Sequence, residues 1–303
     1  MSGQVTTQSA ERVVPAPPAR RRRRRYLAPT LLLAPTVLFL LFFFAWPMVQ
    51  ALVLAVQDRA GVWTLDPLRR MINDINFWPA VRNTLLLIVV LVPLQVTLAL
   101  VMALLLNAGL RGTGLFLYAW AVPLAISDLA AGIVWLSIFA DRGYLNSLLA
   151  GLGLPTFAFL SYEHPVSMFI AVVIAETWRA TAIVMVILVA GLQVIPKEYG
   201  EAAAVFGATG WQRLRHVTLP LLRPSLQVAL ILRTILAFQV FAVVIALAGR
   251  NMPVLASEAY YWYGSYSNPH VAAAYALIIL AFSMVNTLIY LRTLRVRDEQ
   301  IGG

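Results

Sequence analysis

Charged side chains lie well inside long apolar stretches of the chain, where each costs about 2.5 to 3.5 kcal/mol on translocon-insertion scales. Glu176 and Arg179 are spaced i and i+3, so they can pair on one face of a helix. Such a pair predicts a polar position facing a bundle interior or a transport path. A purely structural pair that fixes helix packing is the alternative, and both stay open.

Two further charges need an explanation of the same kind. Asp128 falls in the middle of its apolar stretch and is predicted to line a translocation path together with Glu176 and Arg179. In the alternative, the segment DLAAG marks a helix break, and the Asp128 carboxylate caps the helix that continues. Arg233 lies in the inner third of its stretch, and we expect its long side chain to snorkel to the cytoplasmic interface.

No pattern in the sequence predicts catalysis. A phosphate-binding loop needs a Gly-rich turn that ends in Gly-Lys-Ser/Thr, and the only lysine, Lys197, stands between Pro196 and Glu198. The chain has no cysteine, so neither a disulfide nor a thiolate metal site forms. A histidine metal site is not expected either, since the three histidines are far apart and assigned to both membrane sides: His164, His216 and His270.

Composition identifies an integral membrane protein. The chain has 303 residues, of which 61% are hydrophobic, and a mean hydropathy of +0.80, which excludes a soluble globular domain. The net charge of +10 raises the possibility of nucleic-acid binding. However, residues 1–25 hold seven arginines against one acid, directly before an apolar span. The positive-inside rule therefore favours a cytoplasmic anchor, and no nucleic-acid partner is expected.

The expected fold is all-α, a polytopic membrane protein in which six helices cross the bilayer. Residues 1–26 are predicted to be a disordered basic cytoplasmic tail, 27–295 the transmembrane domain with a core at about 80–295, and 296–303 a second cytoplasmic tail. The charge distribution places both termini and the loops 107–113 and 194–221 inside. The six apolar stretches are 27–56, 80–107, 113–140, 165–193, 222–247 and 271–294.

The polar stretch 196–220 is predicted to form helix, turn and helix at the membrane surface. Its leading proline suits the first turn of a helix, and Glu198 and Glu201 place negative charge near that helix's positive end. Gly207 is a natural stop, and Thr209 is suited to cap a second helix that the closing proline would break.

This stretch resembles the EAA loop of the permease subunits of binding-protein-dependent ABC importers, of the carbohydrate type. The family pattern is Glu-Ala-Ala, then a glycine, then Leu-Pro, which is matched by Glu201, Ala202, Ala203, Gly207, Leu219 and Pro220. The resemblance extends over about residues 27–295. It implies that these residues and Glu198 form a coupling helix that docks on the ATP-hydrolysing subunit.

The resemblance also implies a function, partners and a location. The chain would be a permease that moves a sugar or sugar-like solute inward through a bacterial or archaeal plasma membrane. It would hold no cofactor, since ATP and magnesium would bind separate ATPase subunits. A second permease, usually a different chain, and an extracytoplasmic solute-binding protein would complete the importer, surrounded by membrane lipid.

Two features depart from the family pattern. Carbohydrate-type members usually carry an acidic residue just before the glycine of the loop, where this chain has Phe206, so the docking contact is expected to be more apolar. The outer loop after the fifth span has AGRNMP at 248–253 in place of the usual Gly-rich turn. An ion-coupled secondary transporter or a polytopic scaffold stays the alternative function, in which Glu176 and Asp128 would serve ion coupling.

Overall fold

The structure is a computed structural model that describes residues 31–109 and 111–293. The predicted tails, 1–26 and 296–303, and the first residues of the first predicted span lie outside the described residues. The chain divides into two compact units after Gln50. In the first unit, the described residues form the larger part of the helix Leu31–Ala55, which contains a π-helical turn at Leu41–Ala45 and ends in α2, Trp46–Ala55.

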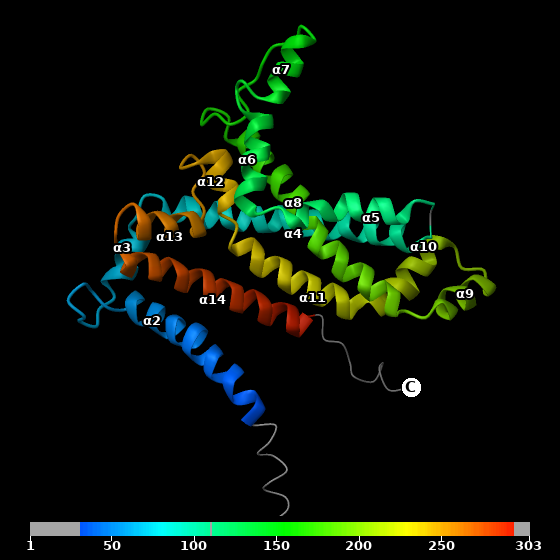
Figure 1. Ribbon diagram of the computed structural model, residues 1–303, viewed down its shortest axis with the longest axis horizontal. Helices are drawn as coiled ribbons and strands as arrows, with labels where there is room; N and C mark the ends of the chain where they lie inside the picture. The colour runs from blue at the N-terminus through cyan, green and yellow to red at the C-terminus, as the bar shows by residue number, and fades with distance from the viewer. Residues whose placement is uncertain (1–30, 110, 294–303) are drawn as a thin grey trace, which may run out of the picture. The chain divides into compact units, whose positions relative to one another are not determined.

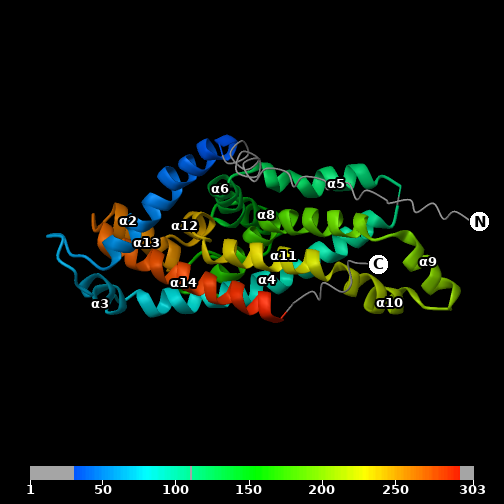
Figure 2. The same cartoon turned by 90° about the horizontal axis from the view of Figure 1, so that it is seen from below.

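The second unit is a bundle of long apolar helices, as Figures 1 and 2 show. Five described helices, Leu31–Ala55 among them, are long and apolar enough to cross a membrane, or six if one bent pair counts as a span. Among the described residues, β-pairing is limited to one isolated bridge, between Gln57 and Trp63. The spanning helices of this unit are α4 (Phe77–Asn107), α8 (Pro165–Val194), α11 (Leu219–Phe238) and α14 (Pro269–Thr293).

The third predicted span, 113–140, is broken. It consists of α5 (Thr113–Ala121), a 3-10 turn (Val122–Ala125) and α6 (Asp128–Phe139), and the two arms meet at 103°. Ile126 and Ser127 are extended between them, with ψ values of 129° and 154°. The predicted span is therefore interrupted by two extended residues, at the helix break that the DLAAG alternative expected.

The fifth predicted span, 222–247, is also shorter than expected. Its helix ends at Phe238, and α12 (Ala242–Ala248) is a separate short helix. Three further short helices, α3 (Asp66–Ile72), α7 (Tyr144–Gly151) and α13 (Leu255–Gly264), connect the long ones. At the other end of the bundle, α9 (Lys197–Val205) and α10 (Gly210–Arg213) occupy the polar stretch (Figure 1).

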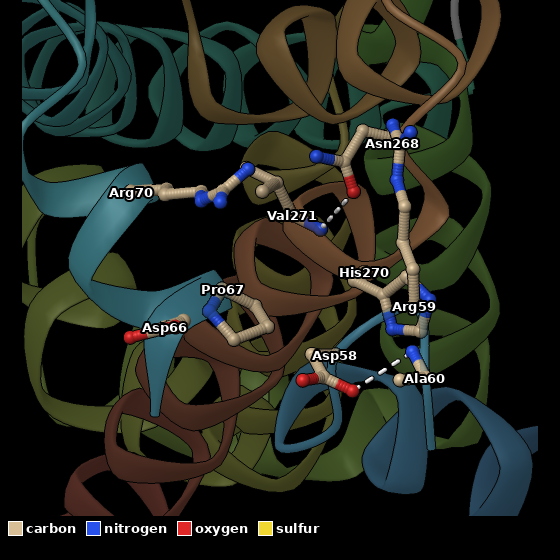
Figure 3. Close-up of a pocket in the computed structure, with 9 residues that line it drawn as sticks. All are labelled: Asp58, Arg59, Ala60, Asp66, Pro67, Arg70, Asn268, His270 and Val271. Atoms are coloured by element: carbon tan, nitrogen blue, oxygen red, sulfur yellow. Dashed lines mark hydrogen bonds between the residues drawn. The ribbon is translucent and has the colours of Figure 1, made fainter. Parts of the chain in front are cut away.

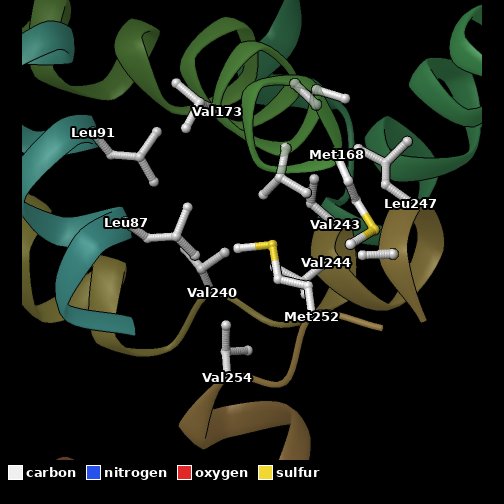
Figure 4. Packing of buried hydrophobic residues seen from close by; sticks show 14 of the residues in the cluster. Leu87, Leu91, Met168, Val173, Val240, Val243, Val244, Leu247, Met252 and Val254 are labelled. Atoms are coloured by element: carbon white, nitrogen blue, oxygen red, sulfur yellow. The ribbon is translucent and has the colours of Figure 1, made fainter. Parts of the chain in front are cut away.

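Buried apolar side chains hold these elements together in three clusters. One joins α4, α6, α8 and α12, and Figure 4 shows Leu87 and Leu91 facing Val240, Val244 and their neighbours. A second joins α4, α8 and α11, and a third joins α3, α13 and α14. Close backbone contacts contribute as well: a Cβ added to Gly132 of α6 would lie 2.6 Å from Ala246 Cβ of α12. Glycine thus lets these two helices approach each other.

Candidate functional site

The predicted pair on α8 forms. Arg179 donates two hydrogen bonds to Glu176, from Nε to Oε2 at 3.1 Å and from Nη2 to Oε1 at 2.7 Å. Glu176 is fully buried at the middle of α8, whereas the Arg179 side chain keeps part of its surface exposed. This two-point contact confirms the pairing predicted from the i and i+3 spacing.

Arg233 corrects an expectation. Its side chain does not snorkel to an interface: it is fully buried, and its Nη2 lies 3.2 Å from Glu176 Oε1. The expected location also fails, because α11 ends at Phe238, which places Arg233 in the last two turns of the helix. The buried Glu176 carboxylate on the neighbouring helix α8 balances the Arg233 charge, which we had expected water at the cytoplasmic interface to solvate.

Gln95 of α4 completes this contact and was missed by sequence reasoning. Its side-chain oxygen accepts a hydrogen bond from Arg233 Nε, and its Nε2 donates to the Glu176 backbone oxygen at 3.0 Å. The residue is fully buried. The available signal was an amide side chain in the middle of a long apolar helix, because a polar group buried there requires a partner.

Asp128 lies at the break in the third span. Its carboxylate does not cap α6, because Ser127 is the N-cap and accepts a hydrogen bond from the Ala130 amide at 3.3 Å. The Asp128 carboxylate instead lies 2.7 Å from Arg179 Nη1, and 52% of its side-chain surface is exposed. The break that the alternative reading expected is confirmed, while its capping residue is the preceding serine.

These residues form one charge-balanced network that links four elements. We call Gln95, Asp128, Glu176, Arg179 and Arg233 the charge network. It contains two carboxylates and two guanidinium groups, so the costly charges inside the bundle compensate one another. Its inner part is fully buried, and its outer part, Asp128 with Arg179, reaches the surface. A role in lining a translocation path stays a prediction for these residues.

At the other end of α8, the helix α9 forms where the sequence predicts it. Pro196 was expected in the first turn of this helix, but it is the N-cap residue, one position before the first helical residue, Lys197. The helix ends in a Schellman motif: the Gly207 amide donates to the Ala204 oxygen at 2.9 Å, and the Ala208 amide donates to the Ala203 oxygen at 3.0 Å. Gly207 has a φ of +79°, which glycine adopts without the steric cost of a Cβ.

The second short helix also starts as predicted. Thr209 accepts a hydrogen bond from the Gln212 amide, and the Gln212 side chain accepts one from the Thr209 amide, which together make a capping box. Pro220, however, does not end this helix. A π-helical turn at Leu214–Thr218 leads directly into α11, with Leu219 and Pro220 in its first turn. Pro220 therefore lies inside the continuous helical segment Gly210–Phe238, directly after the π-helical turn, where it removes one amide donor without ending the helix.

At the opposite end of the bundle, a polar pocket of about 270 Å³ opens beside α3 and the start of α14 (Figure 3). The Asp58 carboxylate accepts hydrogen bonds from the Ala60 and Val62 amides, so it holds its own loop together. The Asn268 side chain accepts a hydrogen bond from the Val271 amide. The pocket was not anticipated from the sequence. Its lining residues are Asp58, Arg59, Ala60, Asp66, Pro67, Arg70, Asn268, His270 and Val271.

A buried acid lies on α13. Glu258 is buried, and its Oε2 has no hydrogen-bond partner among the described residues. Burial raises the pKa of Glu258, Asp74 raises it further, and Arg250 and a hydrogen bond with Asn76 oppose the change. The structure therefore favours the protonated form of this side chain more than water does.

Comparisons with known proteins agree on one family. Residues 25–293 match the family described as "Binding-protein-dependent transport system inner membrane component". The trehalose/maltose transport system permease protein MalF of Thermococcus litoralis is 33% identical over 76% of this chain and 79% of its own length. The sulfoquinovosyl glycerol transport system permease protein SmoG of Agrobacterium fabrum is 32% identical over 75% of each chain.

A solved structure has the same fold. A chain from the crystal structure of a bacterial ABC transporter involved in the import of the acidic polysaccharide alginate gives a TM-score of 0.76. The alignment covers 91% of this chain and 97% of that one, at 21% sequence identity. At this identity the similarity concerns the fold.

Proposed function

Because the chain belongs to the family of binding-protein-dependent transport system inner membrane components, and is thus a multi-pass permease subunit of an ABC importer, we propose that its solute is a sugar or sugar-like molecule. Support comes from the relatives named above, whose names refer to trehalose/maltose and to sulfoquinovosyl glycerol. The subunit is a transport component and not an enzyme.

The observation that carries the docking proposal is the exposed helix α9. It follows the end of α8, within the polar stretch 196–220, and nearly all of its side chains are exposed. We propose that it docks on a separate ATPase subunit, which binds ATP and magnesium, through Glu198, Glu201, Ala202, Ala203 and Gly207. The small alanine side chains let a partner approach the helix backbone closely. Leu219 and Pro220 anchor the far end of the stretch to α11.

The connections of α9 explain how a push on it would reach the bundle. The helix follows α8 directly, and α10 continues through the π-helical turn into α11. The charge network joins α8 to α11 through Glu176 and Arg233, and joins both to α4 through Gln95. Closure of the ATPase pair would therefore move these helices together, as in rigid-body rocking between two states. The solute must favour one of those states for coupling to occur.

The rest of the proposed assembly follows the family. A second permease, as a different chain, would complete the path, and a solute-binding protein would dock on the outer loops. Both chain ends would lie in the cytoplasm of a bacterium or archaeon, and lipid would surround the apolar helices. Asp128, Glu176 and Arg179 are proposed to line the path in at least one of the two states.

One experiment tests the assembly. The tagged chain is extracted in mild detergent from its native membrane, and its companions are identified by mass spectrometry. We expect an ATPase subunit and a second permease, both lost when residues 201–207 are scrambled. Recovery of the folded chain without an ATPase subunit would contradict the proposal. Uptake in proteoliposomes that follows ATP, and not an imposed ion gradient, separates it from an ion-coupled carrier.

A further inference from the structure

Helix α9 carries two exposed stripes of different character. Tyr199, Ala202 and Phe206 are spaced i, i+3 and i+7, so they share one face. Glu198 and Glu201 lie one position earlier in the same spacing, on the adjacent face. Among the described residues, the main contacts of α9 with other elements are those with α10 and the following π-helical turn. Both stripes are therefore free to meet a partner.

Phe206 is the most prominent apolar group on this surface. Its side chain is 90% exposed, and that of Tyr199 is 54% exposed. The Schellman motif fixes the backbone on both sides of Phe206, because Gly207 and Ala208 bond back to the last turn of α9. The ring is thus presented by a rigid support. An exposed aromatic side chain on a preorganised segment is typical of a binding hot spot.

A lipid surface is a poorer occupant than a protein. The charged side chains of α9 are Lys197, Glu198 and Glu201, so the helix has a net charge of −1, and anionic lipid headgroups would repel it. Helices that lie on membranes usually carry Lys and Arg on the polar face. In addition, α9 is exposed around almost its whole circumference, whereas a flat bilayer would cover one face only. A protein cleft can cover both stripes.

We propose that Phe206 is the main anchor of the contact with the ATPase subunit, supported by Tyr199. The partner cleft has an apolar pocket that receives the Phe206 ring, next to a basic side chain that faces Glu198 and Glu201. This inference rests on the proposed function and specifies which chemistry the partner presents. It makes position 206 a determinant of which ATPase the permease accepts.

The test compares four substitutions in the complete importer, purified in detergent and reconstituted. Phe206→Ala empties the proposed pocket, and Phe206→Asp places a carboxylate in it. We expect both to lower the recovery of the ATPase subunit and solute uptake by about tenfold or more. Phe206→Leu keeps an apolar side chain and should stay within about threefold of wild type. Val194→Ala is the matched control, because Val194 is 81% exposed near α9 but outside its stripes.

The possible outcomes separate the inference from the proposed function. If the wild-type chain recovers no ATPase subunit, the proposed function fails first. If the wild type recovers one and Phe206→Asp does so equally well, the pocket is not apolar and the inference is overturned. An equal loss in Phe206→Leu and Phe206→Asp would also overturn it. Circular dichroism of each variant confirms that the helices are retained.

Discussion

Arg233 Nη2 lies 3.2 Å from Glu176 Oε1, and both side chains are fully buried between α11 and α8. Glu176 also accepts two hydrogen bonds from Arg179, so this one carboxylate balances two guanidinium groups. Asp128 supplies the second negative charge from the surface. The stability of the network therefore depends on Glu176 more than on any other member.

Replacement of Glu176 by Gln should destabilise the protein strongly. The buried Arg233 and the partly buried Arg179 would then have only the half-exposed Asp128 as an anion, and breaking a buried ion pair from one side costs about 3 to 5 kcal/mol. Asp128→Asn is the control, because its carboxylate is half exposed and its removal should therefore cost less than that of the fully buried Glu176. Thermal unfolding in detergent measures the difference. Equal losses in the two variants would show that Glu176 has no central position in the network.

Gly207→Ala should reduce coupling while membrane insertion stays intact. A Cβ at position 207 meets no atom within 4 Å, so the effect comes from the backbone alone. The left-handed φ of +79° costs a non-glycine residue about 1 to 2 kcal/mol, which loosens the end of α9.

Gly200→Ala is the matched control for this effect. Gly200 lies inside α9, also with open space at its Cβ. Alanine there should stabilise the helix by about 0.5 to 1 kcal/mol. Solute uptake per ATP hydrolysed is the measurement, and a lower ratio in both variants would rule out the conformational explanation.

Gly132→Ala should separate α6 from α12. The added Cβ would lie 2.6 Å from Ala246 Cβ, and overpacking of this kind costs about 1 to 3 kcal/mol. Ala246→Gly in the same chain should restore part of the loss, since it removes the nearest atom. The remaining loss reflects Val243 Cα, which lies 3.2 Å from the added Cβ. Thermal unfolding of the single and double variants gives the coupling, and additive effects would contradict direct contact.

Glu258 should make stability depend on pH. Burial raises its pKa above the ordinary value of 4.5, so the folded protein binds this proton more tightly than the unfolded chain does. Its contribution to stability is complete below the unfolded pKa and is lost as the pH rises through the folded pKa. Glu258→Gln keeps a neutral side chain of the same shape. Its unfolding temperature should fall less than that of the wild type as pH rises, and parallel curves would contradict the assignment.

Local patterns in the sequence identified several elements correctly. Long apolar runs gave α4, α8 and α14 to within three residues at the boundaries that can be compared. The stop at Gly207 and the cap at Thr209 were predicted because both depend on a few adjacent residues. The Glu176 and Arg179 pair was found for the same reason, since one helical turn joins them.

Other features depended on residues far apart in the chain. Periodicity could not reveal that Arg233 meets Glu176 and Gln95, because these side chains come from three helices. Nor could it locate the end of α11 at Phe238, since the apolar run continues through it, and it offered the break before Asp128 only as one of two alternatives. The sequence by itself determined the membrane-spanning class, the long helices and the capped turns, because short-range hydrogen bonding and hydropathy control them. Only the tertiary structure decided where spans break and which buried charges pair, because packing between helices sets both.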